Sequence, residues 1–177
     1  MFNLYHPNEN GTISYVSQNP MWKTQALSGG TKFANDDDAI AMVNNPEFGI
    51  WNRLVAARLL TGVTVEYNVI QWNCNYDPSY ILQKAIFTVG SAADCLIYEI
   101  MYIMLKKLGY ENTKVSCDKN GFCISEGENN IILKEGDIIT VNFDAKGNYQ
   151  SFTVSYQKKT FWKRTKTCCK TFSKKEA

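Results

Sequence analysis

The feature that most constrains the fold is a run of 21 mainly apolar residues, AIFTVGSAADCLIYEIMYIML, from Ala85 to Leu105. Its length suits a membrane-spanning helix. Two carboxylates, Asp94 and Glu99, lie near its middle, however, and a central Asp costs about 2.5 to 3.5 kcal/mol on insertion into a bilayer. The sequence therefore predicts a helix over residues 91–108 that is buried inside the protein, with a sheet on one side and a second cover on the other.

The segment before this helix is predicted to be helical as well. After the turn sequence NCNYDPSY, a helix is expected to resume near Ser79 and to continue to Leu108, as two helices or as one kinked helix. The weak point is Thr88–Ser91, because a glycine inside a helix costs about 1 kcal/mol relative to alanine.

Period-two alternation begins after Gly109. The runs KVSC, FCIS, IIL, IITVNF and SFTVSY are separated by the turn sequences DKNG, EGENN, KEGD and DAKGN. They predict an antiparallel meander of four or five strands within residues 112–157. A further alternating run, Val63–Trp72, predicts a half-buried strand. The expected fold class is therefore α+β, with an antiparallel sheet packed against the helix at 91–108.

Two shorter helices are predicted upstream of that strand. The first is capped by Asn35 or Asp36 and breaks before Pro46. The second ends at Gly62, a natural residue for a helix C-terminus, and presents one apolar face. The two arginines of the second helix, Arg53 and Arg58, are expected to lie off that face.

Composition divides the chain into three parts. Residues 1–32 are rich in Asn, Gly, Ser and Pro and contain one short alternating run, TISYV, which predicts an extended arm with at most one short strand. Residues 33–157 form the single α+β domain, and residues 158–177 form a basic tail.

Charge separates the tail from the rest of the chain. From Lys158 onward there are eight Lys or Arg and one acid, giving +7, whereas the preceding 157 residues have eleven bases and sixteen acids, giving −5. Because the bases are interleaved with aromatic residues, the tail could neutralise phosphates and offer rings for stacking. The predicted binding residues are Lys158, Lys159, Phe161, Trp162, Lys163, Arg164, Lys166 and Lys170.

Several partners suit such a tail. An acidic protein surface, including the −5 body of a neighbouring copy, is favoured, nucleic acid comes next, and a membrane surface is least favoured, although Cys168 and Cys169 could be acylated in a eukaryotic host. A solvated run that only aids solubility is the competing interpretation, and it is favoured over each of these partners taken singly. The mobile part is expected to begin at Lys166, since Thr160–Thr165 could continue the last strand.

The helix GSAADCLIYEIMYIMLKKLGY resembles the core helix of transglutaminase-like enzymes, which carry their reactive thiol at the position of Cys95. That resemblance implies a His on the following strands and then an Asp. The strands here, KVSCDKNGFCISEG and GDIITVNFD, contain no His, and the single histidine, His6, lies 89 residues upstream of Cys95. Adjacent Asp94 also disfavours a thiolate. Cys95 is therefore predicted to be a small, buried, apolar residue.

Cys117 and Cys123 flank a predicted turn. If Lys119–Gly121 forms a three-residue loop, Asp118 pairs with Phe122 and the two cysteines face each other, so a disulfide becomes feasible in an oxidising environment. Free thiols are favoured instead, because the first ten residues, MFNLYHPNEN, lack a secretory signal and a reducing cytoplasmic location is expected.

No motif for a metal or a cofactor is evident. The cysteines form no CxxC pair and have no histidine nearby, which argues against zinc. The acids Asp36–Asp38 are interpreted as helix-capping residues. No cofactor is therefore predicted.

These observations predict a non-enzymatic interaction or assembly protein that uses its basic aromatic tail to contact an acidic partner. The alternative is a cysteine hydrolase of transglutaminase-like or papain-like type, active or degenerate, with Cys95 as nucleophile. Lysine outnumbers arginine sixteen to three and asparagine reaches seventeen, a bias typical of AT-rich genomes such as those of phages and large viruses. A viral or mobile-element origin is accordingly expected.

Overall fold

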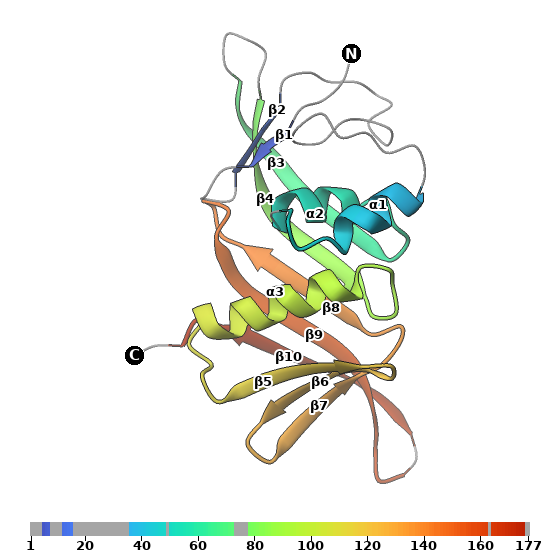
Figure 1. The fold of residues 1–177 in the computed structure, drawn as a ribbon. Helices are drawn as coiled ribbons and strands as arrows, with labels where there is room; N and C mark the ends of the chain where they lie inside the picture. The colour runs from blue at the N-terminus through green and yellow to red at the C-terminus, as the bar shows by residue number, and fades with distance from the viewer. Residues whose placement is uncertain are drawn as a thin grey trace.

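The computed structural model describes residues 5–7, 12–15, 36–48, 50–72, 78–162 and 164–175. Within them the chain forms three helices and ten strands, an α+β fold as predicted (Figure 1). The helices are α1 (Asp36–Val43), α2 (Ile50–Ala57) and α3 (Asp94–Lys107). The strands are β1 (Tyr5–Pro7), β2 (Thr12–Tyr15), β3 (Val63–Trp72), β4 (Pro78–Thr88), β5 (Thr113–Asp118), β6 (Gly121–Glu126), β7 (Asn129–Leu133), β8 (Ile138–Phe143), β9 (Tyr149–Lys159) and β10 (Thr165–Ser173).

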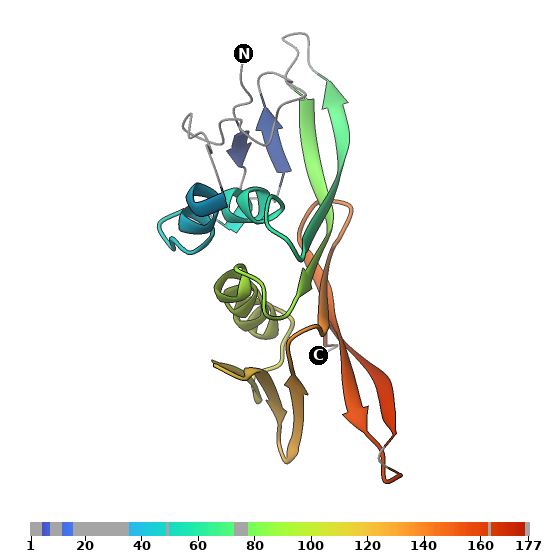
Figure 2. The same cartoon turned by 90° about the vertical axis from the view of Figure 1, so that its right-hand side faces the viewer.

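The strands make two antiparallel sheets. The larger has the order β1-β2-β4-β8-β9-β10, with β3 also paired to β4, and the smaller has the order β5-β6-β7. Figure 2 shows the three helices and the small sheet on the same side of the large sheet. The core lies between these two layers, because an amphipathic element must bury its apolar face against another element.

Helix α3 occupies the centre of this core, as the apolar segment predicted. Its buried side chains recur at helical spacing: Leu96, Ile97, Ile100, Met101, Met104 and Leu105. The helix contacts α2, β5 and β9, so it is covered from more than one direction. Lys106 and Lys107 in its last turn complement the negative end of the helix dipole.

The predicted helix from Ser79 to Thr88 is wrong. This segment is strand β4, which pairs with β3 along one edge and with β2 and β8 along the other. Ala85 and Phe87 are buried in the core, while Ile86 between them is half-buried on the opposite face. Apolar/polar alternation was not evident in this segment, because a central strand can carry apolar residues on both faces. Such a run of apolar residues cannot be distinguished from a buried helix by periodicity alone.

The strands at 112–157 form two structures and not one meander. Strands β5, β6 and β7 make the small sheet, and the chain then crosses to β8 in the large one. The turn before β8 is held by buried Asp137, whose carboxylate accepts the Lys134 amide at 2.8 Å and whose carbonyl accepts the Val89 amide at 2.9 Å. The turn KEGD, Lys134–Asp137, is therefore anchored to Val89, 48 positions earlier in the sequence, and this contact places the start of β8 in the large sheet.

The N-terminal arm also contributes more to the sheet than expected. It supplies two short strands, and β2 pairs with β4 through Thr12, Ile13 and Ser14.

Helix α1 begins at Asp36 and α2 follows the break at Pro46, as predicted. Arg53, expected to lie off the apolar face, is buried and is only 2% exposed.

The prediction of a separate tail is wrong for Thr165–Ser173. These residues form β10, which pairs with β9 along its whole length. Phe172 is fully buried, with its ring 4.7 Å from that of Phe152 and 5.4 Å from that of Tyr110. Burial of an aromatic side chain is a large stabilising term, so Phe172 helps to hold an otherwise polar strand in the sheet.

Candidate functional site

The outer part of the β9–β10 hairpin extends beyond the rest of the sheet. Strand β8 pairs with β9 only as far as Ser155, opposite Ile138, whereas β9 and β10 remain paired to Lys159 and Thr165. Residues 156–162 and 164–168 therefore form a two-stranded projection, which we call the ribbon. Figure 1 shows it in orange and red at the lower right, and Figure 2 shows it pointing away from the helices.

Polar contacts between its two strands hold the ribbon together. The side chains of Gln157 and Thr167 are directly opposite and exchange hydrogen bonds of 2.9 and 3.2 Å. Both the amide and the hydroxyl of Thr160 donate to the carbonyl of Arg164, at 2.8 and 3.1 Å. The ribbon thus has a defined geometry without support from a neighbouring strand.

Two aromatic side chains occupy the tip of the ribbon. Phe161 is 92% exposed and Trp162 is 79% exposed, the highest values among the large hydrophobic residues that the structure describes. Their rings meet edge to face, with centroids 5.5 Å apart and planes at 87°. An exposed pair of this size is unusual on a soluble surface and is typical of an interaction site.

Basic side chains surround the tip. Lys158 and Lys159 on β9, and Arg164 and Lys166 in and after the loop, are exposed, and the sequence contains no acid between Asp144 and Glu176. Lys158 and Lys166 are direct cross-strand partners and therefore project from the same face. Like charges in this position destabilise a hairpin, and an anion placed between them would relieve the repulsion.

The structure thus brings together six of the eight predicted binding residues: Lys158, Lys159, Phe161, Trp162, Arg164 and Lys166. Lys163 lies outside the described residues. Lys170 does not belong to the ribbon, because its ammonium group lies 3.8 Å from Glu126 on β6 and 5.7 Å from the ring centre of Phe172. The supporting pair Gln157 and Thr167 was not among the predicted site residues, because its contact depends on the register that pairs β9 with β10.

Cys95 differs from the buried thiol that was predicted. It lies in the first turn of α3 and is exposed. Both carboxylate oxygens of neighbouring Asp94 accept the Gly90 amide at 3.1 Å. Burial raises the pKa of Asp94, although hydrogen bonds from the Gly90 and Ser91 amides oppose this shift. No basic side chain is placed beside the thiol by any contact among the described residues, and the side chain of His6 is outside them.

Cys117 and Cys123 do not face each other. The register pairs Cys117 with Phe122 and Asp118 with Gly121, so the turn is one residue shorter than predicted and the two cysteines lie on opposite faces. Gly121 has φ +127°, and an added Cβ there would lie 2.0 Å from the Leu133 carbonyl oxygen. This close approach of β7 fixes the register, so the arrangement that would have made a disulfide feasible does not form, and both cysteines are free thiols.

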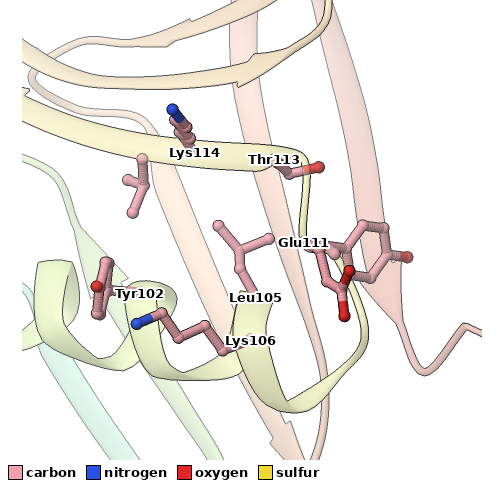
Figure 3. Close-up of a pocket in the computed structure, with 8 residues that line it drawn as sticks. Tyr102, Leu105, Lys106, Glu111, Thr113 and Lys114 are labelled. Atoms are coloured by element: carbon pink, nitrogen blue, oxygen red, sulfur yellow. The ribbon is translucent and has the colours of Figure 1, made fainter.

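A pocket of about 440 Å³ lies between α3 and β5 (Figure 3). Buried Leu105 and Val115 supply apolar lining, and the Lys106 ammonium group lies 4.3 Å from the ring centre of Tyr102. Charges of both signs reach the rim, from Lys106, Lys114 and Glu111. No predicted site residue lines this pocket.

Comparison with known proteins leaves the site to be interpreted from its own chemistry. The chain matches no protein-family model, and no significant match was found to a curated protein or to a solved structure. In the part of the chain that the structure describes, no three His, Cys, Asp or Glu side chains are grouped to hold a metal ion. Among the described helices, none combines the length and apolar character needed to cross a bilayer.

Proposed function

We propose that this chain is a non-enzymatic interaction or assembly protein that binds an acidic partner, a protein or a nucleic acid, through the ribbon. The observation that carries the proposal is the exposed Phe161–Trp162 pair at the tip of a projection lined by cations. Aromatic and arginine side chains are the residues most enriched at binding hot spots. Since both rings are largely exposed, and the ring contact found for them among the described residues is with each other, a partner would give them a surface to bury against.

The charge of the ribbon favours an acidic partner. The four described cations of the ribbon are not balanced by any acid within it, and Lys158 and Lys166 repel each other across the hairpin. An anionic surface would relieve that repulsion and accelerate association by electrostatic steering. A neighbouring copy is one candidate, because residues 1–157 carry a net charge of −5.

We further propose a reducing cytoplasmic location and a viral or mobile-element origin, in keeping with the composition.

The first test is retention of the full chain on immobilised heparin, a general polyanion, at low salt. Lys158→Glu combined with Lys166→Glu should elute at clearly lower salt than the unaltered protein. The matched control is Lys119→Glu with Lys134→Glu, which changes net charge equally at exposed positions outside the ribbon. Equal loss of retention in both variants would mean that net charge alone governs binding, and the proposal would fail.

Self-assembly is tested with the same variants. The mass in solution, measured by light scattering at low salt with and without nuclease treatment, separates a homo-oligomer from a protein that carries nucleic acid. If the ribbon joins copies, the unaltered chain should show a multiple of 20.1 kDa that nuclease does not change, and the ribbon variant should be monomeric.

A further inference from the structure

The chemistry of the ribbon is ordered along its length. Phe161 and Trp162 form the tip, and the exposed cations lie behind them on both strands. At about 3.3 Å per residue, the paired rung Lys158–Lys166 lies roughly 10 Å behind the tip. Gln157 and Thr167 form the next rung, with uncharged side chains. Aromatic, cationic and neutral zones therefore succeed one another from the tip to the sheet.

The cations also flank the ribbon on both sides. Lys158 and Lys166 project from one face, and Lys159, the neighbour of Lys158 in β9, projects from the other. Each strand contributes to this arrangement, since Lys158 and Lys159 belong to β9 whereas Lys166 belongs to β10. A partner that fits must present anionic groups on two sides of a channel, with an apolar or flat surface at its floor.

We infer that this partner is duplex DNA, with the ribbon entering the major groove. The inference rests on the proposed function and narrows its partner class. The major groove of B-DNA is about 12 Å wide and about 8.5 Å deep and admits a two-stranded β-ribbon. Rings at the tip would reach the base edges and the methyl groups of thymine. Lys158 and Lys166, roughly 10 Å behind the tip, would lie level with the phosphates of one wall, and Lys159, one residue nearer the tip on the opposite face, would point toward the other wall.

Two geometric features separate duplex DNA from other nucleic acids. Phe161 and Trp162 stand at 87° to each other, so both rings cannot stack on successive parallel bases of a single strand. The major groove of A-form RNA is too narrow to admit side chains. An acid-free ribbon with cations on both strands thus fits the B-form groove best.

The test is fluorescence anisotropy of the full chain with a labelled 20-base-pair DNA duplex at several salt concentrations. If the four described cations each neutralise one phosphate, the log–log salt slope should be about −3.6. Lys158→Ala or Lys166→Ala should each flatten it by about 0.9. Trp162→Ala should weaken binding about tenfold, because it removes the apolar contact of the ring with the base edges, and should leave the slope unchanged, because loss of an uncharged ring releases no counterions.

Matched controls are Lys119→Ala for charge and Ile132→Ala for an exposed apolar side chain, since both residues lie outside the ribbon. Neither should alter affinity or slope. Parallel titrations use a single strand of the same length, a double-stranded RNA of the same sequence, polyglutamate, and vesicles containing phosphatidylserine.

The possible results distinguish failure of the duplex-DNA inference from failure of the proposed function on which it rests. Tighter binding to duplex DNA than to every other probe, with the stated response of the ribbon variants, supports the inference. Ribbon-dependent binding that favours the single strand, the RNA, polyglutamate or the vesicles overturns the inference and leaves an anion-binding ribbon in place. If the ribbon variants behave like the unaltered chain with every probe, both the inference and the proposed function are wrong.

Discussion

Arg53 of α2 and Glu99 of α3 form an ion pair in which two guanidinium nitrogens face the two carboxylate oxygens, at 2.5 and 3.3 Å. The remaining nitrogen of the same side chain, Nε, donates to the Val43 carbonyl at the end of α1, at 2.8 Å. One buried side chain therefore joins all three helices. This arrangement explains why Glu99 is tolerated within so apolar a helix.

Removing Glu99 should leave the buried guanidinium without its partner. We expect Glu99→Ala to lower the free energy of unfolding by about 3 kcal/mol, the lower end for a buried pair because Glu99 is itself partly exposed. Glu128→Ala, at an exposed turn position, should change it by no more than about 0.5 kcal/mol. Urea unfolding monitored by circular dichroism measures both. Equal effects would show that the ion pair does not contribute to stability.

The two faces of α3 should respond differently to truncation. Ile100 is fully buried, so Ile100→Ala should cost about 2 to 5 kcal/mol, whereas Ile103, which is half-buried, should lose markedly less on the same substitution. Thermal and urea unfolding of the two variants provide the comparison. Near-neutral midpoints for Ile100→Ala would contradict the placement of α3 in the core.

Strand β10 is expected to be required for folding. Phe172→Ala should cost about 3 to 5 kcal/mol, because it removes a fully buried ring packed on Phe152 and Tyr110. Phe161→Ala removes the same side chain at an exposed position and should leave the unfolding midpoint nearly unchanged. Deletion of residues 165–177 should abolish cooperative unfolding. A stable, cooperative truncated protein would show that β10 is dispensable.

Stability should also fall at high pH through Tyr149. Burial raises the pKa of this phenol to about 12, compared with about 10 in an unfolded chain. The folded state binds the phenolic proton more tightly than the unfolded state does, so protonated Tyr149 contributes fully to the free energy of unfolding below pH about 10. As the pH rises from about 10 toward about 12 that contribution is lost, and the free energy of unfolding falls by no more than about 1.4 kcal/mol per pH unit. Tyr149→Phe should lack this component when urea unfolding is repeated across that range. An identical pH dependence in the variant would rule out the contribution.

Cys117 should react slowly despite its exposure. Partial burial raises the pKa of its thiol, and the nearby carboxylates of Asp94 and Asp118 raise it further. Because the thiolate is the reactive form, iodoacetamide near pH 8 should modify Cys117 more slowly in the native protein than in urea. Mass spectrometry of tryptic peptides reports each cysteine separately. Fast and selective labelling of Cys95 near neutral pH would instead support the cysteine-hydrolase hypothesis.

The spacing of apolar residues was sufficient to predict a strand or a helix wherever a single period, two or 3.6 residues, dominated the segment. Val63–Trp72 alternates cleanly and is strand β3, and the spacing of apolar residues after Asp94 is that of helix α3. The cationic and aromatic residues of the ribbon are adjacent in sequence, so their grouping could be recognised without any tertiary information. These features depend on contacts between near neighbours, which the sequence encodes directly.

Where the same residues were compatible with two local structures, contacts between residues distant in sequence determined which one forms. Segment Pro78–Thr88 carries apolar residues on both faces around the polar Gln83 and Lys84, and only its pairing with strands on both sides makes it β4 rather than a helix. Arg53 is buried because Glu99, 46 positions away, compensates its charge. Likewise, Phe172 retains β10 in the sheet through rings from β9 and from the turn after α3, which converts a predicted tail into a strand and leaves the ribbon as its exposed end. Each outcome depends on desolvation by residues distant in sequence, a free energy that no local window contains.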